Sequence, residues 1–272
     1  LEKEDIQEIV LKKVKFGKIP IMVNSKLCVL YNKFNAMINE SDECKYDKGS
    51  NFIISGNEKV IVSQERIAEN KVFVFNNQRQ NKSIDAEIKS VCDKRFSPVI
   101  SNSIKYMFKT NEIVVNTPNF KFHINLFLIL HALGIETDKK LIEMVVYDVD
   151  NKQQTELMNA LNTTLIKYKK RCEDNNLKTT NDILEYLVKY TNYKGIHKDL
   201  KLSPSQKIEY LNNSIILEIL PHLGNNFLKK AYFLGFMTNK LLKVKLGYIN
   251  YDDRDSYQNK RIETPGVLMA SL

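Results

Sequence analysis

The chain has 272 residues, enough to bury a substantial core in one large domain or two modest ones. Hydrophobic residues make up 43% and charged residues 27%, with only 9 glycines and 6 prolines, which excludes collagenous and low-complexity proteins. The 41 Lys and Arg residues exceed the 32 Asp and Glu residues by nine, which favours polyanionic partners, nucleic acid before an anionic membrane.

Cysteine usage argues against both a disulfide framework and a zinc site. Cys28, Cys44, Cys92 and Cys172 lie far apart without a CxxC pair, and the four histidines are scattered. A reducing, intracellular compartment is therefore expected. No signal peptide is visible, and no run approaches the ~20 apolar residues of a membrane span, so no membrane partner is expected.

Strand patterns dominate the first part of the chain. Residues 9–23 favour two short strands or one bent strand, and residues 27–40 favour a helix. A hairpin is predicted where Phe52–Ile54 and Lys59–Val62 flank the turn residues Ser55-Gly56-Asn57. Further strands are predicted at Val72–Phe75, Ile84–Val91, Ser103–Phe108 and Ile113–Val115. In the second, apolar and charged residues alternate from Ile84 to Lys89, which predicts one buried face and one solvated face.

Helical patterns follow Pro118. The predicted helices are Phe122–Leu133, Lys139–Tyr147, Gln153–Lys170, Asn181–Tyr190, Ser203–Leu220 and Phe227–Leu246. Gly134 is the expected residue after the C-cap of the first helix. The fifth has the clearest start, because Ser203, Pro204 and Gln206 supply the N-cap, the first helical residue and a capping box. The order of elements predicts an α+β fold with a β-rich N-terminal part that contains hairpins and a helical C-terminal part. The shift near 118–120 is a candidate subdomain boundary.

Two groups of cations could face either solvent or phosphate. The first group, Lys229, Lys240 and Lys243, falls on one narrow stripe of the last predicted helix at ~100° per residue. The second group is Lys167, Lys169, Lys170 and Arg171. A solvated face is favoured over phosphate contact for both groups.

The segment Asp252–Arg261 (DDRDSYQNKR) carries three carboxylates, three cations and no aliphatic residue. Because unpaired buried charges cost several kcal/mol each, the segment is either a solvated loop or a polar site. Carboxylates can direct neighbouring Arg and Lys side chains toward phosphates or guanine, and can accept a hydrogen bond from a base amino group. Internal ion pairing together with nucleic-acid contact is therefore the favoured interpretation.

Two Asp-x-Asp pairs are the candidate metal ligands. Asp148 and Asp150 form the first, and Asp253 and Asp255 form the second. Carboxylates at this spacing can hold Mg²⁺, but three cations of the same segment would neutralise the second pair. No metal ligand is therefore assigned, and a stand-alone metal-dependent enzyme is the least favoured alternative.

The familiar catalytic motifs are absent from the sequence: there is no P-loop, no GxGxxG after a strand, no GxSxG elbow and no HExxH. His123 and His131 fall within a predicted apolar helix, where packing is favoured over metal ligation.

Four stretches match, in order and spacing, the motifs of one family. They are Asp47–Arg66 (DKGSNFIISGNEKVIVSQER), Ala132–Ile135 (ALGI), Lys230–Leu242 (KAYFLGFMTNKLL) and Asp252–Arg261. They resemble the D-x-GGYFIINGxEKVIVxQER, RALGI, KAFFLGYMINRLL and DD-x-DH-x-GNKR motifs of the second-largest subunit of multisubunit DNA-directed RNA polymerases, the counterpart of bacterial β. The agreement runs from about Ile19 to the end, and the RNA polymerase II-like form is the most similar.

The resemblance implies that the chain is a fragment of that subunit. Residues 1–75 would be the end of a protrusion segment, 76–250 a lobe-like domain, and 251–272 a fork-proximal loop with the start of the returning protrusion segment. The lobe would line the downstream DNA cleft, and Arg254, Asp255, Lys260 and Arg261 are the expected nucleic-acid contacts. The alternative is a docking module for transcription factors with little DNA contact.

The resemblance also implies a nucleotidyltransferase whose chemistry lies elsewhere. No catalytic residue and no cofactor are expected in this chain, because the largest subunit would hold the catalytic Mg²⁺. The implied partners are the largest and other polymerase subunits, DNA and transcription factors. The implied location is the nucleus, or the cytoplasm or virion for a viral enzyme.

Two departures from the family's motifs predict altered local structure. Ser256 stands where the family usually has His, and Gln258 where it usually has Gly. Glycine adopts a positive φ without steric cost, whereas glutamine does not, so a differently shaped loop is expected. Ser50-Asn51 replaces Gly-Tyr and raises the same expectation there.

Overall fold

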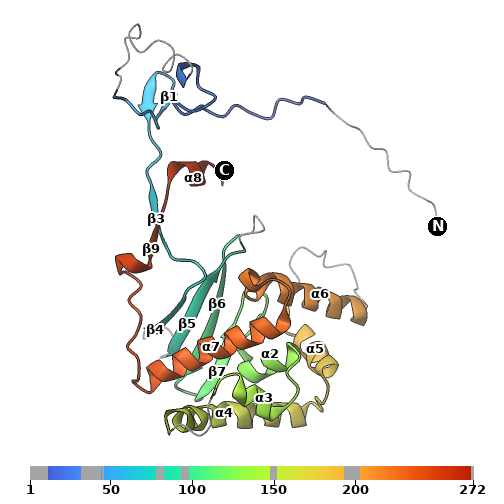
Figure 1. Cartoon of the computed structure of the whole chain (residues 1–272). Helices are drawn as coiled ribbons and strands as arrows, with labels where there is room; N and C mark the ends of the chain where they lie inside the picture. Colours follow the sequence, from blue (N-terminus) through green and yellow to red (C-terminus); the bar gives the residue numbers. More distant parts are fainter. Residues whose placement is uncertain are drawn as a thin grey trace, which may run out of the picture. The chain divides into compact units, whose positions relative to one another are not determined.

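A computed structural model describes residues 12–31, 44, 46–77, 83–92, 98–147, 152–192 and 203–270 (Figure 1). The chain forms two compact units. The first combines Leu1–Glu65 with Ile262–Leu272, and the second is Arg66–Arg261. Strands β3 (Gln64–Ile67) and β9 (Lys260–Glu263) pair in a two-stranded sheet, and the division between the units falls inside both strands.

The first unit contains the predicted hairpin. Strands β1 (Phe52–Ile54) and β2 (Asn57–Lys59) pair antiparallel around a two-residue turn. Both turn residues are left-handed, with φ of 50° at Ser55 and 76° at Gly56, as a type I′ turn requires. The second strand therefore begins and ends earlier than predicted, at Asn57 and Lys59.

The prediction of strands between residues 9 and 23 is wrong for the described residues, because residues 12–23 form no strand. Of the helix predicted at 27–40, residues 29–31 are helical and residues 32–40 lie outside the described part of the chain. The unit also contains α8 (Pro265–Ala270).

The second unit is built on a five-stranded antiparallel sheet. Its strands, in the order β4-β5-β6-β7-β8, are β4 (Val72–Asn77), β5 (Ser83–Ser90), β6 (Ile100–Met107), β7 (Glu112–Asn116) and β8 (Ile124–Asn125). Each neighbour in the sheet is also the neighbour in sequence, so the topology is a simple meander. The first four strands confirm the prediction. Strand β8 was missed, because a two-residue strand shows no periodicity.

The inward face of β5 follows the predicted alternation. Ile84, Ala86 and Ile88 are buried, whereas Glu87 and Lys89 are partly exposed. Asp85 is the exception on the polar side. It is also buried, because Ser83 and Asn77 donate hydrogen bonds to its carboxylate and Lys105 lies 3.7 Å away.

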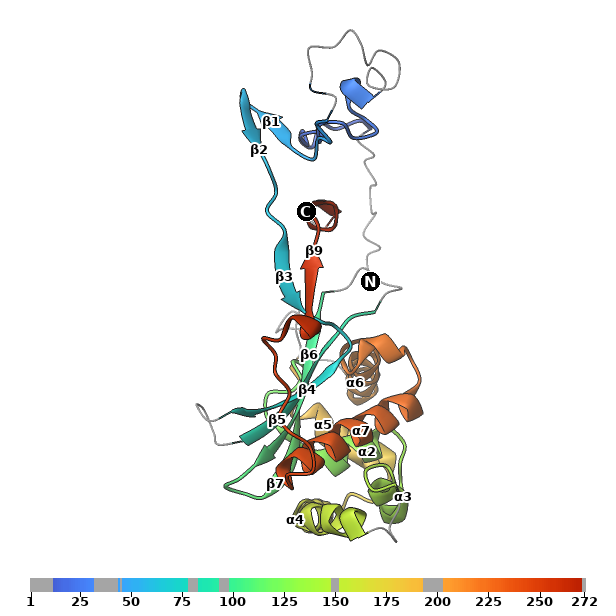
Figure 2. The same cartoon turned by 60° about the vertical axis from the view of Figure 1, so that its left-hand side comes forward.

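Helices cover the sheet. They are α2 (Leu126–Ala132), α3 (Asp138–Glu143), α4 (Lys152–Asp174), α5 (Thr180–Val188), α6 (Pro204–Glu218) and α7 (Phe227–Lys245), with a short 3-10 turn, η1 (Pro221–Leu223), between the last two. The long α7 crosses one face and packs on β4, β5 and β6, and α2 and α4 pack against β7 (Figure 2). The predicted α+β class is therefore confirmed.

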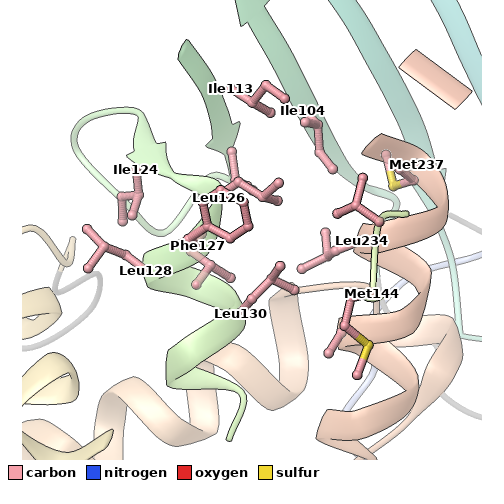
Figure 3. Close-up of a cluster of buried hydrophobic side chains, with 14 of the residues drawn as sticks. Ile104, Ile113, Ile124, Leu126, Phe127, Leu128, Leu130, Met144, Leu234 and Met237 are labelled. Carbon is pink, nitrogen blue, oxygen red and sulfur yellow. The ribbon is translucent and has the colours of Figure 1, made fainter. Parts of the chain in front are cut away.

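Sheet and helices share one apolar core. Ile104 and Ile113 from the sheet, Phe127 from α2, and Leu234 and Met237 from α7 converge in it (Figure 3). The composition shift near 118–120 thus marks a change of secondary structure inside one compact unit and not a boundary between units.

The helix ends show which local signals were reliable. Ser203 and Gln206 form the predicted capping box at α6, and Gly134, with φ of +95°, follows the C-cap of α2 as predicted. Asn125 caps α2 by accepting a hydrogen bond from Phe127 N, so this helix begins at Leu126 and not at Phe122. His123 therefore lies outside the helix and is exposed, which corrects its predicted placement.

Candidate nucleic-acid interface

The chain leaves α7 and runs beside β4, the edge strand of the sheet (Figures 1 and 2). Two hydrogen bonds fix it there: Asp252 N donates to Val74 O at 2.9 Å, and Val74 N donates to Asp252 Oδ2 at 2.7 Å. The segment thus satisfies backbone groups that an edge strand would otherwise leave unpaired. It holds the start of Asp252–Arg261 against the sheet.

Lys240 reinforces this anchor. Its ammonium lies 2.6 Å from Asp252 Oδ2 and donates to Val72 O at 2.9 Å, and only 21% of its side chain is exposed. Lys240 therefore belongs to neither a solvated nor a phosphate-facing stripe. Lys240 joins α7, β4 and the loop. Its ion pair with Asp252 is expected to stabilise the fold more than a fully exposed pair, because both side chains are mostly buried and each has a further hydrogen bond to β4.

Arg254 is fixed by two residues of the sheet. Its guanidinium carbon lies 4.0 Å from the centre of the Phe75 ring, within the range of a cation–π contact, and Nη1 lies 3.5 Å from Glu87 Oε2. The side chain remains 43% exposed. The guanidinium of Arg254 is therefore held in a fixed direction with one side open to solvent, as expected of a side chain that is pre-oriented to bind an anion.

Asn259 ties the far end of the loop. It lies in the 3-10 turn η2 (Tyr257–Asn259), where Asn259 Nδ2 donates to Asp253 O at 2.6 Å and Lys71 Nζ donates to Asn259 Oδ1 at 2.7 Å. Ala68 N donates to Asn259 O at 2.9 Å. The loop is thus held at both ends and across its middle.

The two remaining aspartates differ in role. Asp253 Oδ1 accepts from Asp255 N at 2.9 Å, a turn-stabilising bond, so this carboxylate serves the backbone. The Asp255 side chain is 98% exposed, and the ammonium of Lys260, which is 18% exposed, lies 3.8 Å from Oδ1. An exposed pair of this kind contributes ~0–1 kcal/mol, so Asp255 is available to a ligand.

Arg261 is exposed, and its Nη1 donates hydrogen bonds to two backbone carbonyl oxygens. These are Lys260 O at 2.7 Å and Gln258 O at 3.3 Å. The structure therefore places Arg254 and Asp255 on the anchored loop, and Lys260 and Arg261 directly after it, at the start of β9. Their exposure differs: Asp255 is the most open and Lys260 the most covered.

The two departures differ in backbone conformation. Gln258 lies in η2 and is absent from the positive-φ residues of the described chain, so it adopts its conformation without the expected steric cost. Ser50 does adopt a positive φ, 76°, next to Gly49. A serine there costs roughly 1–2 kcal/mol relative to glycine, and an altered loop shape at Ser50-Asn51 stays a prediction.

The second predicted cation cluster is engaged within the unit. Lys167 and Arg171 lie 3.5 and 3.0 Å from the carboxylate of Glu112, which is 5% exposed, and Lys169 lies 2.8 Å from Asp138. Asn125 Nδ2 also donates to Glu112. Lys167 and Arg171 therefore compensate a buried acid of the fold, whereas Lys169 and Lys170 are exposed, as a solvated face predicts.

Sequence reasoning missed Lys230. Its side chain is fully buried, and Nζ donates to Ile215 O at 2.9 Å and Ile216 O at 2.7 Å, in the last turn of α6. Burial lowers the pKa of Lys230 to about 8. The available signal was that Lys230 shares one helical face with Leu234, Met237 and Leu241, which are apolar.

His131 is a packed core residue, as predicted. Its Nδ1 lies 2.7 Å from the Tyr168 hydroxyl, and burial lowers the pKa of His131. The pair Asp148 and Asp150 lies outside the described residues. Within the described ranges, no three His, Cys, Asp or Glu side chains gather as a metal site would require, and no helix is both long and apolar enough to cross a membrane.

Comparison with known proteins identifies the family of this chain. The chain matches the RNA polymerase beta subunit family over residues 1–272 and belongs to that family. The resemblance drawn from the four motifs is thereby confirmed.

The individual proteins to which the chain is similar are second-largest subunits of RNA polymerases. The chain is 35% identical over 265 residues to the DNA-directed RNA polymerase II subunit RPB2 of Encephalitozoon cuniculi, covering 96% of this chain and 22% of that protein. It is 30% identical to DNA-directed RNA polymerase subunit 2 of Acanthamoeba polyphaga mimivirus, with the same coverage of each. It is also 30% identical to subunit Rpo2N of Methanocaldococcus jannaschii, over 100% of this chain and 51% of that protein. The chain thus spans between about a fifth and a half of these relatives.

Proposed function

We propose that this chain is the lobe-containing part of a second-largest RNA polymerase subunit and that it contacts DNA near the fork of the transcription bubble. The loop Asp252–Arg261 carries this proposal. It is held on the sheet by Asp252, Arg254 and Asn259, yet it leaves charged side chains open to solvent. Cations held in fixed directions position a phosphate backbone without reading its sequence.

The assembled enzyme would extend RNA by nucleotidyl transfer. Its partners would be the largest and other polymerase subunits, DNA and transcription factors, and Mg²⁺ in the largest subunit would supply the chemistry. Within the chain, 1–75 would end one protrusion segment, 76–250 would form the lobe, and 251–272 would lead into the returning segment. The relatives come from eukaryotes, an archaeon and a virus, which supports a nuclear location, or a cytoplasmic or virion location for a viral enzyme.

The four predicted contact residues would make different contacts, because they differ in exposure. Arg261 and the open face of Arg254 would meet phosphates, and Lys260 would contribute at closer range. Asp255 is the most exposed, which suits it either to orient Lys260 or to accept a hydrogen bond from a base amino group.

Charge reversal tests the proposal. Lys260→Glu together with Arg261→Glu in the assembled polymerase is expected to weaken DNA retention and to lower the slope of log affinity against log salt by about two. Lys139→Glu is the matched control, because that side chain is 87% exposed on α3, away from the loop. An unchanged salt slope in the double variant would remove the DNA-contact role.

One observation favours a second function, docking of transcription factors. Leu228, Tyr232 and Phe236 recur every four residues on α7 and are about half exposed. Such an apolar stripe is typical of protein contact surfaces. Tyr232→Ala with Phe236→Ala would weaken factor binding without changing the salt slope, which separates the two functions.

A further inference from the structure

One aromatic side chain on the loop has no structural task that the described residues reveal. Tyr257 begins η2 and is 87% exposed. A tyrosine buries a large apolar area when it packs in a core, and here it gains none of that stabilisation. Its exposure therefore points to a contact outside the described chain.

The backbone that carries this ring is held tightly. Asn259 N donates to Ser256 O at 2.9 Å across the turn, and Asn259 Nδ2 donates to Asp253 O at 2.6 Å. Lys71, from the segment before β4, donates to Asn259 Oδ1 at 2.7 Å. On a fixed backbone only the two side-chain torsions of tyrosine remain to be ordered on binding, which favours a stacking contact.

The surroundings of Tyr257 suit a nucleobase better than a protein. Its neighbours on the loop are the exposed, polar side chains of Asp255, Gln258 and Arg261. A protein contact surface has an apolar centre with a polar rim, whereas Asp252–Arg261 contains no aliphatic residue. An aromatic ring with cations beside it is the combination that binds unpaired nucleic acid, because each base has a π-face and each nucleotide has a phosphate.

From these observations we propose that Tyr257 stacks on an unpaired DNA base, with Arg261 on the adjoining phosphate. This inference rests on the proposed function, since it names the chemical group that the same loop would take. Bases inside a duplex are already stacked on their neighbours, so the preferred partner is a single-stranded segment of the bubble.

The test uses the assembled polymerase on DNA with a preformed bubble, in which 2-aminopurine replaces one unpaired base at a time. Wild type and Tyr257→Phe are expected to quench its fluorescence at one or two adjacent positions. Tyr257→Leu keeps an apolar side chain but lacks the ring, so quenching is lost and bubble affinity falls roughly 5- to 100-fold. The salt slope is unchanged because no charge is altered.

Arg261→Gln provides the comparison that separates the two proposals. It is expected to lower the salt slope by about one while quenching persists. If Tyr257→Leu matches wild type and Arg261→Gln still lowers the slope, stacking is wrong and the DNA-contact role stands. If neither variant changes anything, both are wrong. If Tyr257→Leu weakens only binding of a protein, with quenching intact, Tyr257 is a protein contact and stacking is overturned.

Discussion

Replacing Lys230 with alanine is expected to lower the free energy of unfolding of the unit Arg66–Arg261 by about 2–5 kcal/mol. The ammonium is fully buried and satisfies two carbonyls, Ile215 O and Ile216 O, at the end of α6. Alanine leaves these acceptors with fewer donors and opens a cavity, and both changes destabilise. Hydrogen exchange of α6 and α7 amides in the full subunit measures the loss.

Lys229→Ala is the matched control, because Lys229 is the exposed neighbour on the same helix. Its effect is expected to stay within about 0.5 kcal/mol. Equal effects of the two variants would contradict the assignment of Lys230 as the link between α6 and α7.

The pH dependence of the same residue has a definite sign. The pKa of Lys230 is about 8 in the folded protein, against an ordinary value of 10.5. Between these values the unfolded chain binds more protons, so the contribution of Lys230 to stability rises with pH from 8 to 10.5 and is lost as pH falls through 8. Relative to Lys230→Met, wild type should gain about 2 kcal/mol between pH 8 and pH 9.5.

Gly235→Ala is expected to destabilise the same unit by about 3 kcal/mol. A Cβ at this position would lie 2.1 Å from Met144 O and 2.8 Å from Met144 C, atoms of a backbone that cannot rotate away. Helix α7 therefore depends on glycine for its close approach to the end of α3. Without that contact the substitution would stabilise a helix by roughly 0.5–1 kcal/mol, so the sign of the effect is diagnostic.

The control for this variant is Gly266→Ala. Gly266 lies in α8 with open space around its Cα and no positive φ. Alanine there should be neutral or slightly stabilising by hydrogen exchange. A neutral Gly235→Ala would show that α7 and residue 144 lie further apart than described.

The sequence was most informative where structure is set by local chemistry. The capping box at Ser203, the C-terminal Gly134 and the alternation along β5 all depend on residues a few positions apart, and each was predicted. The start of α2 was misplaced because the apolar run from Phe122 hides the cap at Asn125. Residues 12–23 have strand-like composition, but β propensity describes fit to a neighbouring strand. Within the described residues no strand includes them, although Val23 exchanges backbone hydrogen bonds with Ser50 and Asn51.

The candidate site could be found in the sequence but not built from it. Its charge density and its resemblance to the DD-x-DH-x-GNKR motif marked Asp252–Arg261. Its anchors lie far away in sequence: Val74 is 178 residues from Asp252, Glu87 is 167 from Arg254, and Lys71 is 188 from Asn259. No local pattern records such pairings.

The roles of the lysines could not be predicted from composition, for the same reason. A helical stripe placed Lys240 beside Lys229 and Lys243, yet only the position of Asp252 on β4 explains why Lys240 turns inward. Burial of Lys230 likewise depends on where α6 ends.

The most direct test of the account is photo-crosslinking from Gln258 in the assembled polymerase on bubble DNA. Gln258 is exposed in η2, next to Tyr257 in sequence. A photoreactive residue at Gln258 is predicted to crosslink to DNA at the edge of the bubble, whereas the same residue at Lys139 on α3 should not. Crosslinks from Gln258 to protein alone would contradict a nucleic-acid interface at Asp252–Arg261.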